Sequence, residues 1–471
     1  LSVDENLFFS PELGKTDKFF AAVLGGKSVG VPGLVKMLEL AHQYHGELDW
    51  QQLFSPAIQL AGQGFAVSER LNTLLRLVPK VKQREEIKQY FFDQQGRPLA
   101  IGAQLKNPEY AQTLVMLAKQ GGDYLYHSEL TQKIITAVNE DDNVGYLTTK
   151  DFIEYQPLER TPVCRQVFNY RLCGMGPPSS GATTVLATLL ILEQLAEPIL
   201  AAGDEPIENN PLLAHYFIEA LRLAFADRNT YVADPKFVPV PINQLLETNY
   251  LRSRAQLISA QRAMPVVVAG DLAPPLATRF TTQSSPELES TTHLSIVDQL
   301  GNAVSMTTSI ETAFGSRLMV GGFLLNNQLT DFSFRPRNLN KERIANCVEG
   351  GKRPRSSMSP MIVFDQNNQP ILIIGSPGGK RIIPYVAGFI YEVLALGRAP
   401  EAALQRPHIT SIGHGVEVEQ GTSASLIDGL ATLGHKPQVK YQTSGLHLIY
   451  RNQGQWLGLA DPRREGTAIG E

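Results

Sequence analysis

Two neighbouring stretches of alternating polar and apolar residues constrain the fold more strongly than any other part of this sequence. They run over residues 291–298 and 303–310, and Gly301 lies in the short turn between them. Alternation with a period of two is typical of a strand with one buried face, and two such strands around a glycine-containing turn predict an antiparallel hairpin. We therefore expect a half-buried hairpin that begins near Thr291.

The other expected elements occur in runs of helices or strands rather than in strict alternation. Before the hairpin, the spacing of apolar residues predicts one strand, 168–175, and helices over 34–44, 50–62, 68–77, 110–120, 129–139, 182–195 and 214–229. After it, we expect strands at 323–325, 361–364, 371–374, 416–419, 446–450 and 456–459 and a helix over 381–396. This order favours an α+β fold of packed helix and sheet layers over a parallel doubly wound sheet.

Composition excludes several classes of protein. The chain has 471 residues, 43% of them hydrophobic, which is enough for a large core. Its net charge of -4, with mixed signs, gives no support to nucleic-acid binding. No apolar run reaches the roughly 18 residues of a membrane span. The chain begins with Leu1 and no signal-peptide pattern follows, so we expect that an upstream segment has been removed or left out.

The cysteines and histidines indicate neither a disulfide framework nor a metal centre. Cys164 and Cys173 are nine residues apart in a strand-like region and could pair across a hairpin, but the sparse, odd count of three cysteines, with Cys347, favours buried free thiols. Nine histidines are scattered, without an HExxH or CxxC pattern. We therefore expect no metal site and no cofactor.

Polar segments around the hairpin carry most of the recognisable motifs. Residues 264–290 are polar and lack periodicity, so we expect a flexible segment that would make a cut before Thr291 accessible. Three motifs follow the hairpin: Asn326-Asn327-Gln328-Leu329-Thr330-Asp331, Arg353-Pro354-Arg355-Ser356-Ser357-Met358-Ser359-Pro360 and Gly375-Ser376-Pro377-Gly378-Gly379.

In this order and at these spacings, the motifs and Thr291-Thr292-His293 resemble the γ-glutamyltranspeptidase family of N-terminal-nucleophile hydrolases. The similarity extends from about Gly30 to the Asp461-Pro462-Arg463 end. It implies a four-layer αββα sandwich made from a large portion, 1–290, and a small portion, 291–471, which arise from one precursor by cleavage between Ser290 and Thr291 and remain together as a heterodimer. Members of this family are commonly exported, so a periplasmic or extracellular location is expected.

Cleavage before Thr291 would give one residue both groups that acyl transfer requires. Its hydroxyl is the nucleophile, and its new α-amine, with a pKa of about 7.7–8.0, takes the hydroxyl proton. The acyl-enzyme would then be resolved by water or by an amine. Gly378 and Gly379 lie in a turn between a strand and a helix, where backbone N–H groups can stabilise an oxyanion. Taken alone, such a turn would be an ordinary glycine-rich connection.

The resemblance assigns a role to each candidate residue. Thr291 matches the nucleophile, and Ser309 stands where the family has a Thr that supports the nucleophile's hydroxyl. Gly378 and Gly379 match the oxyanion hole. Gln328 and Asp331 match the residues that hold the substrate's α-amino group, and Ser356 and Ser357 match the pair that binds its α-carboxylate. A carboxylate such as Asp331 is well suited to bind an ammonium group.

Two departures from the family pattern leave alternatives open. Glu311 stands where the family usually has Asn, and a carboxylate there would either repel the substrate's α-carboxylate or reinforce ammonium binding beside Asp331. The family's α-carboxylate Arg belongs to a segment near which this chain begins, and no equivalent is visible. The leading hypothesis is a self-processing enzyme that transfers or hydrolyses γ-glutamyl groups of compounds such as glutathione, with water, an amino acid or a peptide as acceptor. The alternatives are a cephalosporin or glutaryl acylase-like amidase of the same fold, and an unprocessed, inactive member that acts as a binding protein.

Two further segments allow only less specific predictions. The charged end of the helix over 214–229 is expected to be structural, with Arg222, Asp227 and Arg228 in ion pairs. The basic segment 332–351 has no apolar periodicity and is either a lid over the site or a plain surface loop.

Overall fold

The computed structural model describes residues 3–78, 80–201, 203, 205–272, 290–413 and 415–470. The polar segment expected at 264–290 lies outside the described residues over 273–289. The chain divides into two compact units. Unit 1 comprises Leu1–Glu159, Ser309–Thr330 and Val348–Gly351, and unit 2 comprises Arg160–Thr308, Asp331–Cys347 and Lys352–Glu471. Each unit is described by itself.

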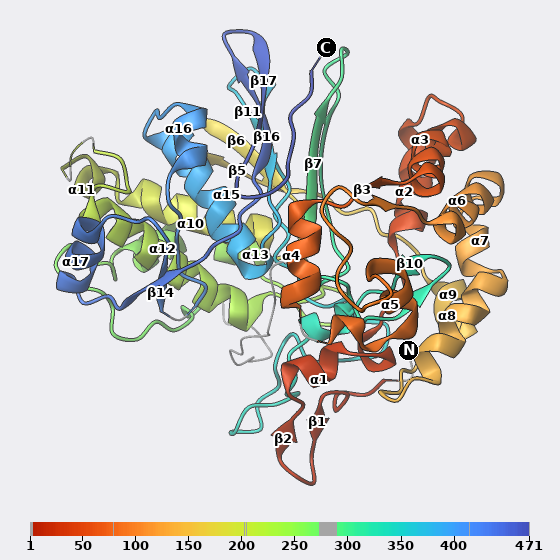
Figure 1. Cartoon of the computed structure of the whole chain (residues 1–471). Helices are drawn as coiled ribbons and strands as arrows, with labels where there is room; N and C mark the ends of the chain where they lie inside the picture. The colour runs from red at the N-terminus through yellow and green to blue at the C-terminus, as the bar shows by residue number, and fades with distance from the viewer. Residues whose placement is uncertain are drawn as a thin grey trace. The chain divides into compact units, whose positions relative to one another are not determined.

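Unit 1 is mainly helical (Figure 1). Its α-helices are α1 (Phe19–Val23), α2 (Leu34–His45), α3 (Trp50–Gln63), α4 (Glu69–Leu77), α5 (Glu85–Phe91), α6 (Pro108–Gln120), α7 (Asp123–Tyr126), α8 (Glu129–Asn139) and α9 (Thr149–Glu154). Its short strands pair as β1 (Phe9–Ser10) with β2 (Lys15–Thr16), β3 (Phe65–Ala66) with β4 (Gln104–Leu105), and β9 (Met319–Val320) with β10 (Phe323–Leu324). The five helices expected in this region are confirmed as α2, α3, α4, α6 and α8.

Polar side chains fix where these helices begin and how α6 meets the later part of unit 1. Asp49 caps α3 by accepting from the backbone N–H of Gln51, and Ser68 caps α4 in the same way. At α6, Asn107 Nδ2 donates to the carbonyl of Gly322 and Thr113 Oγ1 to that of Gly321, both at 2.7 Å. The turn between β9 and β10 is thereby held against α6, which fixes the segment that carries Ser309, Glu311 and Gln328.

Unit 2 is built on a six-stranded sheet in which every adjacent pair of strands is antiparallel. Its order is β17 (Gln455–Ala460), β16 (His447–Asn452), β12 (Pro370–Gly375), β11 (Met361–Phe364), β6 (Tyr170–Gly174) and β5 (Val163–Val167). A smaller sheet contains β13 (Ile409–Thr410), β14 (Val416–Glu419) and β15 (Pro437–Lys440). The strands expected after residue 360 are thus confirmed, and β5 was not predicted.

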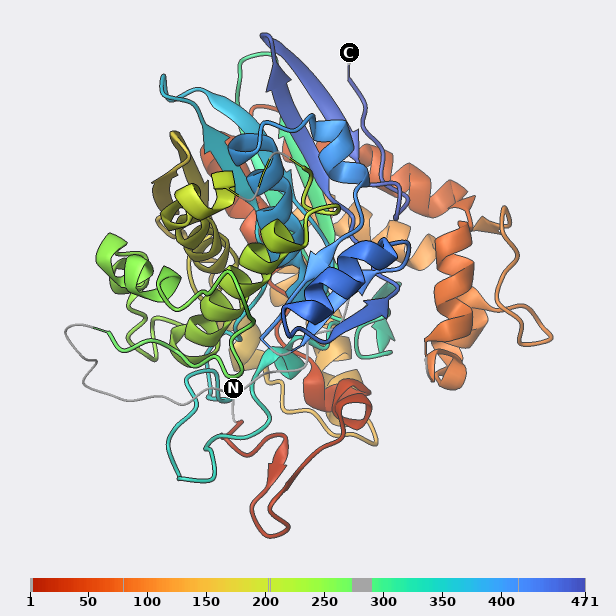
Figure 2. The ribbon, with the colours of Figure 1, turned by 90° about the vertical axis from the view of Figure 1, so that its left-hand side faces the viewer.

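Helices cover one face of the large sheet (Figures 1 and 2). The α-helices of unit 2 are α10 (Gly181–Gln194), α11 (Ala196–Ala201), α12 (Pro211–Tyr231), α13 (Ile242–Leu245), α14 (Thr248–Ala255), α15 (Ile382–Ile390), α16 (Pro400–Gln405) and α17 (Ala424–Thr432). Nearly every residue of α10 and all of α15 are buried, because these helices lie between the sheet and other helices. The helix expected over 381–396 is α15, followed by a π-helical turn at Tyr391–Ala395.

The predicted hairpin forms the layer on the other face of the sheet (Figure 1). It consists of β7 (Thr292–Val297) and β8 (Ala303–Thr308), with Gly301 at a φ of 86° in the turn. Small polar side chains allow close contact with the sheet: Ser305 Oγ donates to the carbonyl of Ile374 at 3.0 Å and Ser295 Oγ to that of Ile373 at 3.3 Å. Unit 2 therefore has a helix layer, a sheet and a hairpin layer, and the four-layer αββα arrangement stays a prediction.

The expectation of free thiols at Cys164 and Cys173 is wrong, because these residues form a disulfide. They are directly opposite each other in the ladder between β5 and β6. The count of cysteines favoured free thiols because it contains no information on strand register, which is what brings the two sulfur atoms together. Cys347 is buried and not disulfide-bonded. Among the described residues, none of the helices has the combination of length and hydropathy that a membrane crossing requires.

Candidate active site

One end of the large sheet gathers the chain segments that carry the candidate residues of unit 2. In the ladder, Met361 pairs with Gly174 on one side and with Ile374 on the other, and Ile374 pairs with Leu448. The chain therefore leaves β6 and β12, and enters β11 and β16, at the same end of the sheet. The serine pair before β11 and the glycine pair after β12 therefore lie at the same end of the sheet.

Thr291 reaches this edge through the hairpin. The next residue but one, His293, is buried, and its ring lies so close to Gly375 that a Cβ on this glycine would be 2.3 Å from it. Because His293 contacts Gly375, this contact lies two residues from Thr291 and three residues from Gly378. Arg464 Nη1 donates to the carbonyl of Thr291 at 3.5 Å and its Nε donates to that of Thr443 at 2.8 Å.

The hydroxyl of Thr291 adjoins the peptide bond that was expected to be cut. Thr291 Oγ1 donates a short hydrogen bond to the carbonyl oxygen of Ser290. The neighbouring His293 adds no positive charge here, because burial, and secondarily His447, lower its pKa to about 3. With so low a pKa, His293 is a weak base, so another group has to accept the proton of the Thr291 hydroxyl.

Gly378 and Gly379 connect β12 to the helical segment that leads into α15. Their φ angles are 141° and 58°, in the region that favours glycine. A Cβ at Gly378 would also lie 2.9 Å from Cε2 of Tyr385, in α15. This turn therefore requires glycine at Gly378 for two reasons, and it presents backbone N–H groups at the start of a helix, where negative charge is favoured.

Ser356 is held by backbone and hydroxyl contacts with the segment before α10. Its N–H donates to the carbonyl of Pro178 at 3.1 Å, and its carbonyl accepts from both the N–H and the hydroxyl of Ser180, at 2.8 and 2.6 Å. Ser357 Oγ accepts from Arg228 Nη2 at 2.5 Å. Both serines are therefore fixed from behind by residues far away in the sequence.

Asp331 is joined to the serine pair through Asn346. Asn346 Nδ2 donates to the carbonyl of Asp331 at 2.8 Å, and its Oδ1 accepts from the N–H of Arg355 at 2.9 Å. Asp331 is buried. One amide side chain thus sets the spacing between the residue expected to bind an ammonium group and the pair expected to bind a carboxylate.

The remaining candidates, Ser309, Glu311 and Gln328, belong to unit 1. Ser309 Oγ accepts from the N–H of Glu311 at 2.9 Å. Glu311 is buried at a φ of 76° and accepts a short hydrogen bond from Asn327 Nδ2. Burial lowers the pKa of nearby Arg317 to about 10, and the negative charge of Glu311 opposes that shift. The charge of Glu311 is therefore partly compensated within its own unit.

The sequence did not reveal the residues that position the candidate site residues through hydrogen bonds: Arg228, Asn346 and Arg464. Arg222 pairs with Glu219 and Asp227 with Arg254, as expected of the end of α12. Arg228 donates to uncharged side chains, including that of Ser357. The one available signal was a charged residue in a helix that is largely buried, and this signal does not reveal the partners of Arg228. Asn346 and Arg464 gave no signal of their own.

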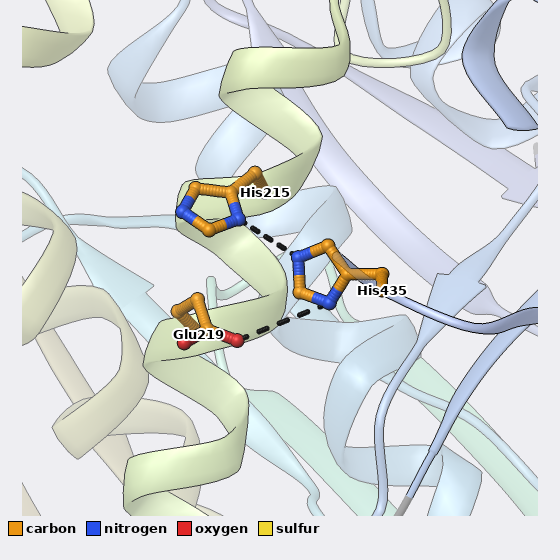
Figure 3. A group of neighbouring side chains, drawn as sticks. All are labelled: His215, Glu219 and His435. Atoms are coloured by element: carbon orange, nitrogen blue, oxygen red, sulfur yellow. Dashed lines mark hydrogen bonds and ion pairs between the residues drawn. The ribbon is translucent and has the colours of Figure 1, made fainter. Parts of the chain in front are cut away.

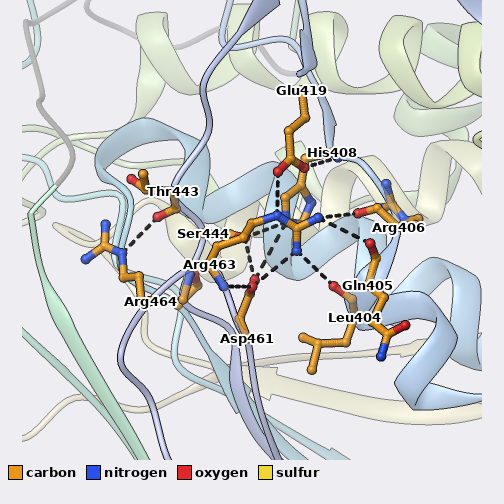
Figure 4. A network of polar contacts seen from close by, with 12 residues as sticks. Leu404, Gln405, Arg406, His408, Glu419, Thr443, Ser444, Asp461, Arg463 and Arg464 are labelled. Atoms are coloured by element: carbon orange, nitrogen blue, oxygen red, sulfur yellow. Dashed lines mark hydrogen bonds and ion pairs between the residues drawn. The ribbon is translucent and has the colours of Figure 1, made fainter. Parts of the chain in front are cut away.

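His408, Ser444 and Asp461 form a Ser–His–Asp arrangement whose hydrogen bonds run in the wrong direction for a serine nucleophile (Figure 4). Ser444 Oγ donates to Asp461 Oδ2 at 2.5 Å, so it accepts from His408 Nε2, also at 2.5 Å. In a hydrolase triad the hydroxyl donates to the imidazole instead. Arg463 donates to Asp461 and to Glu419, at 3.1 and 2.5 Å. This buried network anchors the segment that carries Arg464 beside Thr291.

Among the described residues, His215, Glu219 and His435 form a group whose potential ligand atoms all lie within 4.8 Å of one another (Figure 3). His215 Nε2 donates to the carbonyl of Ser259, so the Nδ1 of the neutral ring accepts from His435 Nε2, both at 2.8 Å. Glu219 accepts from Arg222 at 2.6 Å and from a backbone N–H at 2.8 Å. Because His215 Nδ1 and the Glu219 carboxylate already accept hydrogen bonds, we interpret the group as a connection between α12 and the loop after α17. The expected absence of a metal site stays a prediction.

Known proteins resemble this chain in sequence and in fold. The family model described as Gamma-glutamyltranspeptidase matches residues 2–471. The glutathione hydrolase proenzyme of Bacillus subtilis (strain 168) is 33% identical over 481 residues, covering 98% of this chain and 78% of that protein. Cephalosporin acylase from Bacillus halodurans superposes with a TM-score of 0.79 at 25% identity, over 95% of this chain and 80% of that one.

γ-Glutamyltranspeptidase from Helicobacter pylori superposes with a TM-score of 0.52 at 27% identity, over 56% of this chain and 73% of that one. These likenesses show an α+β fold of the N-terminal-nucleophile hydrolase type. Because the family model spans nearly the whole sequence, this chain belongs to the γ-glutamyltranspeptidase family.

Proposed function

We propose that this protein is a self-processing γ-glutamyl transferase or hydrolase that cleaves γ-glutamyl amides, such as glutathione, through an acyl-enzyme on Thr291. The observation that carries the proposal is the position of the Thr291 hydroxyl against the carbonyl of Ser290, at the sheet end that also carries Gly378 and Gly379. Nucleophile and oxyanion donors at one edge are what acyl transfer requires.

The first reaction is cleavage of the chain itself. Thr291 Oγ1 attacks the carbonyl carbon of Ser290, the C–N bond to Thr291 breaks, and the nitrogen takes the hydroxyl proton. Water then hydrolyses the resulting ester. The products are a carboxylate on Ser290 and a free α-amine on Thr291.

In turnover, the new amine acts as the base. It takes the proton of Thr291 Oγ1, which attacks the γ-carbonyl carbon of the substrate, and the N–H groups of Gly378 and Gly379 stabilise the oxyanion. The leaving amine departs with a proton. Water, an amino acid or a peptide amine then attacks the ester and regenerates Thr291.

The two charged groups on the α-carbon of the substrate would be bound by different residues. Asp331 and Gln328 would hold the α-ammonium group, and Ser356 and Ser357 would donate to the α-carboxylate. Ser309 would support the Thr291 hydroxyl. The two fragments, 1–290 and 291–471, would remain together as a heterodimer. The disulfide between Cys164 and Cys173 supports an oxidising compartment, periplasmic or extracellular, which fractionation of the native host would test.

Substitution of Thr291 tests the mechanism directly. Thr291→Ala removes the hydroxyl, so the chain should remain uncut in denaturing mass spectrometry and should lose γ-glutamyl anilide hydrolysis. Thr291→Ser keeps a hydroxyl and an α-amine, so it should still be processed and retain turnover at a lower rate. Turnover by a properly folded Thr291→Ala variant would contradict the mechanism.

A second candidate function is that of an acylase on glutaryl compounds. The carboxylate of Glu311 and the structural likeness to a cephalosporin acylase favour it. Glutaryl anilide lacks the α-amino group that Asp331 and Gln328 would bind. A γ-glutamyl enzyme should therefore prefer γ-glutamyl over glutaryl anilide in kcat/KM by at least about tenfold, the value of one charge-assisted hydrogen bond. Equal or reversed preference would favour the acylase.

A further inference from the structure

Arg228 lies in the last turn of α12 with its side chain almost wholly buried. Burial of a guanidinium group is costly unless its N–H groups are satisfied. Its hydrogen bonds include Nε to Ser180 Oγ at 2.7 Å, Nη1 to Asn229 Oδ1 at 2.9 Å and Nη2 to Ser357 Oγ at 2.5 Å. This buried cation therefore contacts one of the two serines expected at the substrate's carboxylate.

These contacts fix the direction of the serine protons. A guanidinium group can only donate, so Ser357 Oγ must accept from Arg228, and its own O–H has to point to a different acceptor. The same holds for Ser180, whose Oγ accepts from Arg228 and donates to the carbonyl of Ser356 at 2.6 Å. A hydrogen bond from a cationic donor to the hydroxyl oxygen also makes its O–H a stronger donor.

A second arginine makes this geometry rigid. Arg355 directly precedes the serine pair, and its buried Nη1 donates to the carbonyls of Arg228, Asn229 and Val232 at 3.2, 3.4 and 3.4 Å. The segment with Ser357 is thereby attached to the same helix end that carries the guanidinium group.

We propose that Arg228 is a positioning residue that sets Ser357 as a hydrogen-bond donor to the carboxylate of the acyl substrate. The inference rests on the proposed function of Ser357. It gives this chain a cation at the carboxylate end although sequence reasoning found no arginine there. Arg228 itself would not touch the substrate.

The test compares two substrates that differ by one carboxylate, γ-glutamyl anilide and 4-aminobutyryl anilide, on the processed enzyme. Arg228→Gln should lower kcat/KM for γ-glutamyl anilide by about tenfold to a hundredfold, the usual range for loss of a hydrogen bond to a charged group, and much less for 4-aminobutyryl anilide. Arg228→Lys keeps the charge but loses the planar, forked arrangement of donors, so its kcat/KM for γ-glutamyl anilide should fall between that of Arg228→Gln and that of the wild type. The ratio of the two kcat/KM values is the readout, because general loosening of the fold would lower both alike.

Two further variants separate positioning from stability. With Ser357→Ala already present, Arg228→Gln should cause little additional loss of carboxylate selectivity, because the two residues act as one unit. Arg254→Lys is a matched control: this arginine is also buried in unit 2 but pairs with Asp227, and its replacement should leave the substrate ratio unchanged.

Equal losses on both anilides, or additive effects with Ser357→Ala, would overturn the inference. If Arg228 variants fail to fold, Ser180→Ala still tests the inference, because this substitution removes the acceptor of Arg228 Nε. It should lower the ratio of kcat/KM for γ-glutamyl anilide to kcat/KM for 4-aminobutyryl anilide, as Arg228→Gln does. If the wild type turns over no γ-glutamyl compound, the proposed function fails by itself. Calorimetric binding of glutarate and butyrate, which differ by one carboxylate, then decides: Arg228→Gln must weaken binding of glutarate selectively.

Discussion

Gly378 is a residue at which backbone conformation and chemistry impose the same requirement. Its φ of 141° and the 2.9 Å approach of a Cβ to Tyr385 both oppose a side chain. Gly378→Ala should therefore shift the turn and its N–H groups, and kcat should fall by about a hundredfold or more, as for loss of an oxyanion donor. Steady-state kinetics on the processed enzyme would measure this, with KM changing much less than kcat.

Gly454 offers a control for backbone strain. It has a φ of 86° in the turn between β16 and β17, and nothing lies within 4 Å of an added Cβ. Gly454→Ala should lower the melting temperature slightly and leave kcat unchanged. Similar kcat values for the two variants would argue against an oxyanion role for Gly378.

Single residues also show where sequence reasoning stops. Thr291 and Gly378 were identified because each lies in a short motif with a fixed local geometry. The contacts of Arg228 with Ser180 and Ser357 were not expected, because these residues are 48 and 129 positions away in the sequence. Such contacts depend on how helices and strands are packed, which local patterns do not encode.

At the scale of elements, periodicity predicted the existence of helices and strands better than their burial. The hairpin of β7 and β8 and the helix α10 were expected within one or two residues of their observed bounds. Helix α2 was also expected, from an apolar stripe, yet none of its side chains is buried, and Leu34 and Leu38 are 41% and 39% exposed. The periodicity of apolar residues predicts which face of a helix or strand is apolar, whereas the burial of that face depends on the elements that pack against it.

The disulfide illustrates the same limit between elements. Cys164 and Cys173 were placed correctly in a strand-like region, but the pairing depends on the register of β5 against β6. That register depends on the turn at Phe168 and Asn169, whose φ angles of 51° and 67° have no obvious signature in the sequence. Neither residue is glycine, so the turn was not recognisable as a hairpin connection.

For the molecule as a whole, buried histidines predict a loss of stability in acid. Burial is the largest cause of a lowered pKa for each of His215, His293, His408, His435 and His447. For His435 the value falls from 6.5 to about 3. Between these values the unfolded chain binds a proton that the folded chain does not, so the free energy of unfolding decreases as pH falls, by up to about 1.4 kcal/mol per pH unit for each such histidine.

In the part of the chain that the structure describes, Asp227 and Glu392 act in the opposite direction. Burial raises the pKa of Asp227 to about 6 and also raises that of Glu392, so these groups bind protons in the folded state first. The histidines outnumber them, and the melting temperature measured by calorimetry should therefore fall steadily below about pH 6.5. His435→Gln should reduce that slope, while His127→Gln, at an exposed histidine, should not. A melting temperature that is constant from pH 7 to 5 would contradict the prediction.

The pairing of β6 with β11 has a consequence for how the mature protein assembles and unfolds. The first strand precedes Ser290 and the second follows Thr291, yet they are neighbours in the central sheet over four register pairs. After cleavage, two polypeptides would share one sheet. An uncut chain folds in a unimolecular process, whereas denatured fragments would first have to meet, at a rate that decreases with dilution. The mature protein would thus be assembled once, and its persistence would be governed by how slowly it unfolds.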